Sequence, residues 1–181
     1  MARWFGNTER YFILFMEISF LGWAVETVFF WFCYGELHDR GFMTLPFCTI
    51  YGCSFLLLYF LIGPPKKREL RSAGERIGAA ACYFLLCALI PTALELLTGW
   101  FFQQMFGLRL WSYESYRFHF QGYICLEYAL LWGILLPPCM KYLFLPLKRR
   151  AFALSPRYVR TVSGVLAALA AADWAVNFSR L

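Results

Sequence analysis

The stretch "YFILFMEISFLGWAVETVFFWFC", residues 11–33, is 23 residues long and carries only two charged side chains, Glu17 and Glu26. A helix needs about 20 mostly apolar residues to cross the roughly 30 Å of hydrocarbon in a bilayer. The stretch is too long for the apolar core of a signal peptide, and no small-x-small cleavage site follows it. We therefore expect it to stay in the membrane as a transmembrane helix.

Four further apolar runs follow this stretch, separated by charged residues, glycine and proline. They cover about residues 48–63, 77–97, 122–142 and 161–176. The whole chain is 61% hydrophobic and 15% charged, whereas a soluble domain is about 45–50% apolar and about 25% charged. The sequence therefore predicts an all-α, polytopic integral membrane protein, in which residues 1–181 form a single transmembrane domain of about five helices.

Basic residues gather after the second and fourth apolar runs, and this indicates how the chain is oriented. The two groups are Lys66, Lys67, Arg68, Arg71 and Arg76, and then Lys141, Lys148, Arg149, Arg150, Arg157 and Arg160. Cytoplasmic loops carry an excess of lysine and arginine, so we expect both groups and the N-terminus to lie inside. Because the formal net charge of +6 comes largely from these groups, nucleic acid is not expected as a partner.

The connection from Trp100 to Gln121 is crowded with tryptophan, phenylalanine and tyrosine. Such rings rest favourably among lipid headgroups, because the ring is apolar and its polar edge can bond to water. We therefore expect an aromatic-rich segment along the outer membrane interface.

Cysteine and histidine do not form a metal-binding pattern in this chain. Of the seven cysteines, no two have the spacing CxxC, and His38 and His119 are not flanked by cysteines that could complete a site. The sequence therefore predicts no metal site and no cofactor, and the cysteines are expected to pack as small apolar residues.

Acidic residues inside the apolar runs are candidates for a polar site. Each costs about 2.5–3.5 kcal/mol on insertion scales, so it calls for a partner or a water-filled cavity. With the orientation above, Glu26 lies just beyond the middle of the membrane, and Glu95, Glu127 and Asp173 lie toward the outer ends of their helices. We expect Arg40 to fold back over the outer half of the bundle and to share a buried polar site with Glu26 and Glu95.

Small residues mark two helix faces. Ser19, Gly22 and Glu26 recur at i, i+3 and i+7, so they share one face that should look into the bundle. In the last apolar run the small residues repeat at four-residue spacing, which predicts close helix contact. These residues are Gly164, Ala168 and Ala172.

Glycine and proline interrupt the chain between its first two apolar runs. Gly41 and Gly52 permit unusual backbone angles, and Pro46 suits the first turn of the following helix. Two interpretations are open at this point. The segment is either irregular backbone that lines a cavity or an ordinary outer turn.

Four motifs in fixed order resemble one bacterial membrane family. They are "SFLGWAVET" (19–27), "RGFMTLPFCTIYG" (40–52), "LELLTGWFFQQMFGLRLWSY" (94–113) and "FQGYICLEYALLWG" (120–133). The family is named putative ABC-transporter type IV, or CmpB-like putative ABC transporter permeases. By resemblance its motif positions are Gly22, Glu26, Arg40, Gly41, Phe42, Pro46, Tyr51, Gly52, Glu95, Gly99, Trp111, Tyr113, Gly122, Trp132 and Gly133.

The chain departs from the family pattern at a few positions. Ser112 stands where the family has the aspartate of a Trp-Asp-Tyr pattern, which removes a carboxylate there. Leu45 stands where a glycine precedes the proline, and Thr49 stands where a second proline is usual.

The resemblance implies a permease-like component of an ABC transporter in the bacterial cytoplasmic membrane. It would move a solute or lipid through a polar cavity. The cavity residues would be Glu26, Arg40, Glu95, Trp111, Tyr113, Glu127 and Asp173, and the backbone motif residues would be Gly22, Gly41, Pro46, Tyr51, Gly52 and Gly122. The chain has no GxxxxGK[ST] phosphate loop, so ATP hydrolysis would need a separate ATP-binding subunit, and a homo-oligomer is expected within the lipid bilayer.

Two other functions stay open from the sequence. One is a membrane-embedded enzyme that acts on a lipid-linked substrate, with a carboxylate as general base and an arginine on the phosphate. The other is a non-catalytic assembly or sensory protein, in which acids and arginines form structural ion pairs only.

Overall fold

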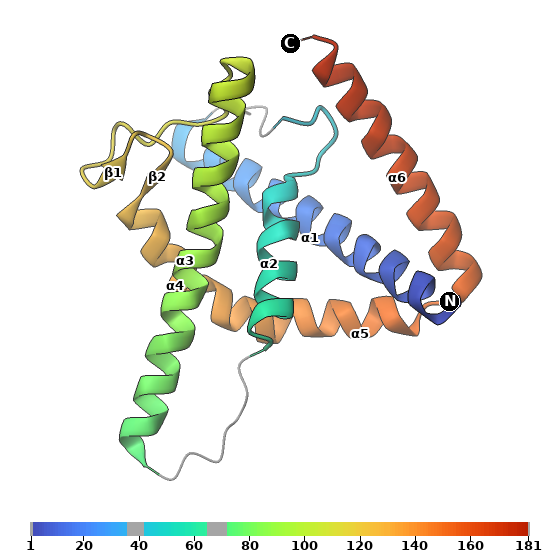
Figure 1. The fold of residues 1–181 in the computed structure, drawn as a ribbon, viewed down its shortest axis with the longest axis horizontal. Helices are drawn as coiled ribbons and strands as arrows, with labels where there is room; N and C mark the ends of the chain where they lie inside the picture. Colours follow the sequence, from blue (N-terminus) through green and yellow to red (C-terminus); the bar gives the residue numbers. More distant parts are fainter. Residues whose placement is uncertain (1, 36–41, 65–71, 181) are drawn as a thin grey trace. The chain divides into compact units, whose positions relative to one another are not determined.

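The computed structural model describes residues 2–35, 42–64 and 72–180. Its helices are α1 (Ala2–Tyr34), α2 (Thr49–Leu61), α3 (Ala73–Phe106), α4 (Leu126–Cys139), α5 (Leu145–Ala153) and α6 (Pro156–Phe178), with a π-helical turn, η1 (Met140–Phe144), between α4 and α5. Strands β1 (His119–Phe120) and β2 (Ile124–Cys125) pair as an antiparallel hairpin (Figure 1). The predicted all-α class is confirmed.

Within the described residues, four helical stretches are long and apolar enough to cross a membrane. They are Asn7–Cys33, Ala73–Phe106, Leu126–Ala153 and Pro156–Phe178. The second predicted run corresponds to α2, which is apolar but only 13 residues long. The chain is therefore a membrane protein built from four long apolar helices and one shorter one, while the exact membrane boundaries stay a prediction.

Helix α3 is longer at both ends than the apolar run of residues 77–97 on which it was predicted. At its start, the Ser72 side chain and Glu75 form a capping box that satisfies backbone N–H groups. At its end, Gly107 adopts a left-handed conformation with φ 66°, and its N–H bonds to the carbonyl groups of Gln103 and Phe102. The expected interfacial connection is therefore helical as far as Phe106, and only the remainder folds as the hairpin loop.

Backbone contacts divide the chain into two compact units, residues 1–55 with 146–181 and residues 56–145. The single transmembrane domain stays a prediction. In the first unit, α1 packs against α6, and the two helices begin side by side near the N-terminus (Figure 1). The buried side chains of α1 lie on consecutive turns and are Ile13, Leu14, Met16, Ile18 and Ser19.

The expected close contact along the small-residue face of α6 is absent from the part of the chain that the structure describes. Gly164, Ala168 and Ala172 are all exposed, and a Cβ atom on Gly164 would meet nothing within 4 Å. The prediction was wrong in this unit because α6 turns a different face inward, with Val159 and Ser163 buried.

In the second unit, α3 packs along α4. A Cβ atom on Gly133 would lie 2.6 Å from the ring of Phe84, so a glycine is needed where the ring crosses α4. Pro91 lies inside α3, which continues through it, on a buried face that also holds Glu95 and Gly99. The hairpin lies beside the end of α3 that leads into it (Figure 1).

Candidate functional site

An intramembrane carboxyl group meets a tyrosine where α1 crosses α2. The hydroxyl of Tyr51 donates a hydrogen bond of 3.5 Å to Oε2 of Glu26. Gly22 lies one helical turn before Glu26, and a Cβ atom there would be 2.3 Å from Cγ of Tyr51. The absence of a side chain at Gly22 therefore lets the tyrosine ring cross α1 and reach the acid, which explains why these three motif residues occur together.

Gly52 on α2 makes a second close contact at the same crossing, with residues of α1 that lie one to two turns before Gly22. A Cβ atom on Gly52 would lie 2.5 Å from the ring of Phe15 and from Oγ of Ser19, and 2.7 Å from the carbonyl oxygen of Phe15. The backbone N–H of Cys48 donates to the carbonyl oxygen of Ser19 at 3.0 Å. These contacts hold the start of α2 against α1, so they set the position of Tyr51.

Asp173 binds the backbone of the turn that leads into α2. Its carboxylate oxygens accept the N–H groups of Thr44 at 3.1 Å and Leu45 at 3.2 Å. Asn177, one turn later on α6, donates to the same carboxylate at 3.2 Å, and its own oxygen lies 3.2 Å from the Thr44 hydroxyl. An acid that was predicted to line a polar cavity is therefore occupied in fixing a loop.

Aromatic rings reinforce this attachment of the turn to α6. The ring of Phe42 lies 5.4 Å from that of Trp174 and 4.7 Å from that of Phe178, between ring centroids. Pro46 lies in this turn, three residues before α2 begins at Thr49, so the prediction that it starts the helix was wrong. Between the proline and the helix, the N–H of Phe47 bonds to the carbonyl oxygen of Leu45 and that of Cys48 to the carbonyl oxygen of Ser19 on α1, so this part of the chain is held as a turn.

Glu95 carries the second intramembrane carboxyl group, and it lies in the other unit. Its residue is 7% exposed, and the indole Nε1–H of Trp132 on α4 donates to Oε1 at 3.0 Å. A hydrogen bond between a buried carboxyl group and a ring donor offsets part of the cost of placing the acid among apolar helices. The pair thus joins α3 to α4 at the depth where both are apolar.

The loop after α3 is folded around Trp111 and Tyr123. The indole Nε1–H of Trp111 donates to the carbonyl oxygen of Tyr123 at 2.8 Å, and both rings cover Gly99, where a Cβ atom would lie 3.0 Å from Tyr123. The backbone N–H of Tyr113 donates to the carbonyl oxygen of Gly122 at 2.9 Å. These motif residues therefore build a rigid cap on the end of α3.

Arg109 locks the far side of this loop. Its guanidinium group donates to the carboxylate of Glu114 at 2.7 Å and to the carbonyl oxygen of Gln121 at 2.8 Å. Gly122 has φ 73°, and a Cβ atom there would be 2.6 Å from the guanidinium group. The neighbouring guanidinium holds the pKa of the exposed Glu114 carboxyl below its usual range.

Ser112 retains a turn-forming role at the position where the family pattern has aspartate. Its hydroxyl oxygen accepts the backbone N–H of Glu114 at 3.3 Å. Aspartate side chains make the same local bond to the residue two positions later. The substitution therefore removes a charge but keeps an acceptor for the turn.

The structure brings some of the predicted site residues together and leaves others apart. Glu26 meets Tyr51, and Trp111 and Tyr113 join one cap. Glu127 is exposed in the first turn of α4, where a negative charge suits the positive end of the helix dipole. Arg40 and Gly41 lie outside the described residues, so the shared site of Arg40 with Glu26 and Glu95 stays a prediction.

Sequence reasoning missed several partners that the structure supplies. Trp132 was recognised as a motif position but not as the donor to Glu95, and Asn177 was not recognised although its spacing from Asp173 is that of neighbours on one helix face. Glu17 is paired with Arg150, which is 133 residues away in the sequence. Because the two residues are so far apart in the sequence, no local sequence pattern could indicate that they form a pair.

The chain was compared with known protein families, curated proteins and solved structures. The sequence model of the family described as "Putative ABC-transporter type IV" matches residues 13–178, which is most of the chain and includes both carboxyl sites. No curated protein and no solved structure matches the chain.

Proposed function

The chain belongs to the putative ABC-transporter type IV family, and on that premise we propose that it is the permease-like membrane component of a transporter that moves a solute or lipid. ATP hydrolysis is supplied by a separate subunit, because the chain has no phosphate-binding loop. The protein works as a homo-oligomer, since four long apolar helices and a short one are few for a wide polar path.

One observation supports transport in particular, namely a hydrogen-bonded carboxyl group inside the apolar part of each unit. Glu26 is bound by Tyr51 and Glu95 by Trp132. Acids at membrane depth are costly and mark pathways for ions and polar substrates in membrane proteins. The donor to each acid is an aromatic side chain, Tyr51 or Trp132, whose ring is otherwise apolar. Each acid can therefore be hydrogen-bonded without water entering the apolar part of its helix.

The partner subunit is tested by isolating the protein from its own membrane. We expect native mass spectrometry in gentle detergent to show an ATP-binding subunit bound to it, and ATP hydrolysis by the complex in proteoliposomes. Glu26→Gln should leave the complex assembled and lower ATP turnover by about tenfold, the effect of roughly 1.4 kcal/mol on the barrier. The matched control is Glu9→Gln, the same chemical change near the end of the same helix, which should not alter turnover.

Two results would overturn this proposal. The first is a protein that supports its cellular activity with no ATP-binding subunit attached, which would favour a membrane enzyme on a lipid-linked substrate. The second is an unchanged ATP turnover of the complex in Glu26→Gln, which would favour a purely structural role for the acids.

We further propose that the protein lies in the bacterial cytoplasmic membrane with its N-terminus inside, because the basic residues gather at alternate connections. Both Ser72 and Ser115 are exposed; Ser72 caps the start of α3, and Ser115 lies in the loop between the end of α3 and β1. In a cysteine-free background, an impermeant thiol reagent should label Ser115→Cys in intact cells and label Ser72→Cys only after permeabilisation. Labelling of Ser72→Cys alone in intact cells would reverse the orientation.

A further inference from the structure

The junction between α5 and α6 is a fixed corner. Arg10 of α1 donates to the carbonyl oxygens of Ala151 at 2.7 Å and Leu154 at 2.9 Å. Carbonyl groups at the end of a helix have no partner within it, so the guanidinium group serves as their cap. Ser155 then caps α6 by accepting the N–H of Tyr158 at 3.4 Å. The corner therefore holds its side chains in a defined place.

Five basic residues belong to this corner, and we call them the basic corner: Lys148, Arg149, Arg150, Arg157 and Arg160. Two of them have partners within the unit. Arg150 pairs with Glu17, and the ammonium group of Lys148 lies 5.1 Å from the ring centroid of Phe152. The other three are arginines: Arg149, Arg157 and Arg160.

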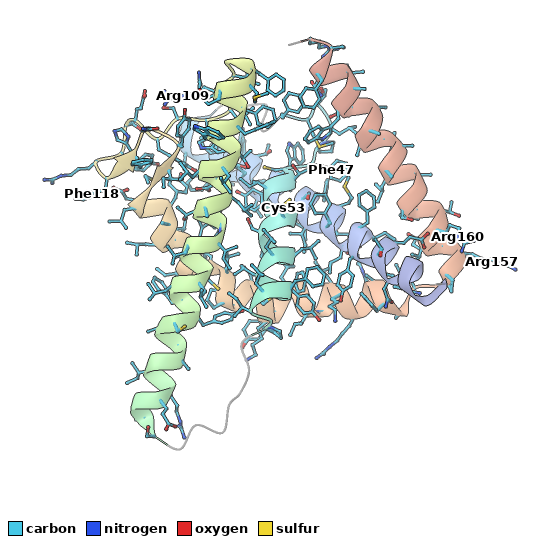
Figure 2. All side chains as sticks on the ribbon, viewed as in Figure 1. Phe47, Cys53, Arg109, Phe118, Arg157 and Arg160 are labelled. Atoms are coloured by element: carbon cyan, nitrogen blue, oxygen red, sulfur yellow. The ribbon has the colours of Figure 1, made fainter. Side chains whose placement is uncertain are left out.

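Arg149, Arg157 and Arg160 are all exposed. Among the residues that the structure describes, none of the three forms an ion pair with an acid, and the first turn of α6 contains no acidic residue. Figure 2 shows Arg157 and Arg160 together at the start of α6. Three exposed guanidinium groups on one corner, without an acidic partner among the described residues, make this surface complementary to an anion.

The position of the corner between two candidate spans indicates which kind of anion it meets. The corner lies where two candidate spans meet, Leu126–Ala153 and Pro156–Phe178, so its side chains reach the level of the lipid headgroups. Tyr158 is 54% exposed there, as expected for a ring at the membrane interface. The abundant anions at that level are lipid phosphates, which arginine binds through paired N–H donors.

We propose that the basic corner binds the phosphate headgroups of anionic phospholipids in the adjoining leaflet. Arg149, Arg157 and Arg160 make the contacts, and their apolar stems lie along the acyl boundary. Arg10 holds the corner rigid, so the lipid meets a preformed surface. The binding fixes α6 and the end of α5 to the bilayer and is independent of any transported substrate.

The test compares lipid binding to the purified protein in neutral detergent. We expect native mass spectrometry to show more phosphatidylglycerol than phosphatidylcholine bound at equal concentration. Arg157→Gln/Arg160→Gln should weaken phosphatidylglycerol binding about 25-fold, since each basic residue near an anionic surface contributes about fivefold in affinity. Arg157→Lys/Arg160→Lys, which keeps the charge but loses the paired donors, should weaken it much less.

The matched control is Arg117→Gln/Arg180→Gln, which removes two exposed arginines that are not part of the basic corner and should leave binding unchanged. Melting temperatures in detergent without added lipid check folding, and the exposed corner arginines should not affect them. An equal loss in the control pair, equal binding of both lipids, or displacement of the lipid by inorganic phosphate at the same concentration would each overturn the proposal.

Discussion

Gly52→Ala is expected to lower the stability of the protein by about 1–3 kcal/mol or more, the usual cost of forcing an extra group into a packed interior. The added methyl group would lie 2.5 Å from the Phe15 ring and 2.7 Å from the Phe15 carbonyl oxygen. The ring could rotate, but the carbonyl belongs to the backbone of α1, so the two helices would have to separate. The measurement is the melting temperature of the detergent-solubilised protein, followed by tryptophan fluorescence.

Gly164→Ala in α6 is the control for this experiment. It makes the same chemical change in the same unit, at a position where the new methyl group meets nothing within 4 Å. Alanine is favoured over glycine inside a helix by about 0.5–1 kcal/mol, so the melting temperature should stay the same or rise. If Gly52→Ala melts no lower than Gly164→Ala, the close crossing of α1 and α2 is wrong.

These two glycines show why small residues are hard to interpret from a sequence. Gly164, Ala168 and Ala172 repeat at a spacing typical of packed membrane helices, yet they are exposed in the described chain. Gly22 does lie on the buried face predicted from its spacing with Ser19 and Glu26, but Gly52 belongs to no such repeat, and each of the two glycines accepts an aromatic ring from the neighbouring helix. Spacing indicates which residues share a face, but the partner that covers this face is set by contacts distant in the sequence.

The membrane class and the helices could be predicted because both depend on local properties. The length of an apolar run and its few charges decide whether a segment can cross a bilayer. The ends of α3 were also readable in principle, since Ser72 with Glu75 is a capping-box pattern and Gly107 is a typical helix terminator. They were missed because the apolar run alone was used to set the bounds.

The roles of the acids could not be predicted in the same way. Asp173 and Glu95 both lie in apolar helices. From the sequence alone, the free-energy cost of placing either acid in the membrane is the same, so the cost does not distinguish their roles. Asp173 binds backbone N–H groups that are 128 and 129 residues away, whereas Glu95 binds the side chain of Trp132. Almost every residue has a backbone N–H, so the sequence does not show which one will bind an acid. An acid that fixes a loop and an acid in a polar site therefore cannot be told apart in the sequence.

Trp132→Phe is expected to lower stability by about 1–3 kcal/mol, because it leaves a buried oxygen of Glu95 without the indole donor that now lies 3.0 Å away. Part of any loss would come from the smaller ring. The same substitution is therefore repeated in Glu95→Gln, where an amide replaces the carboxyl group that accepts the bond. We expect Trp132→Phe to cost less in that background, with a coupling of about 1 kcal/mol between the two positions.

The control for ring size is Trp100→Phe on α3, at an indole that is 51% exposed and should tolerate the change. All variants are compared by melting temperature in one detergent. A coupling near zero between Trp132 and Glu95, or an equal loss in Trp100→Phe, would contradict the hydrogen bond. A measurable coupling would instead place the energetic link between α3 and α4 at the carboxyl group itself, because a loss that came only from the smaller ring at position 132 would be the same in both backgrounds.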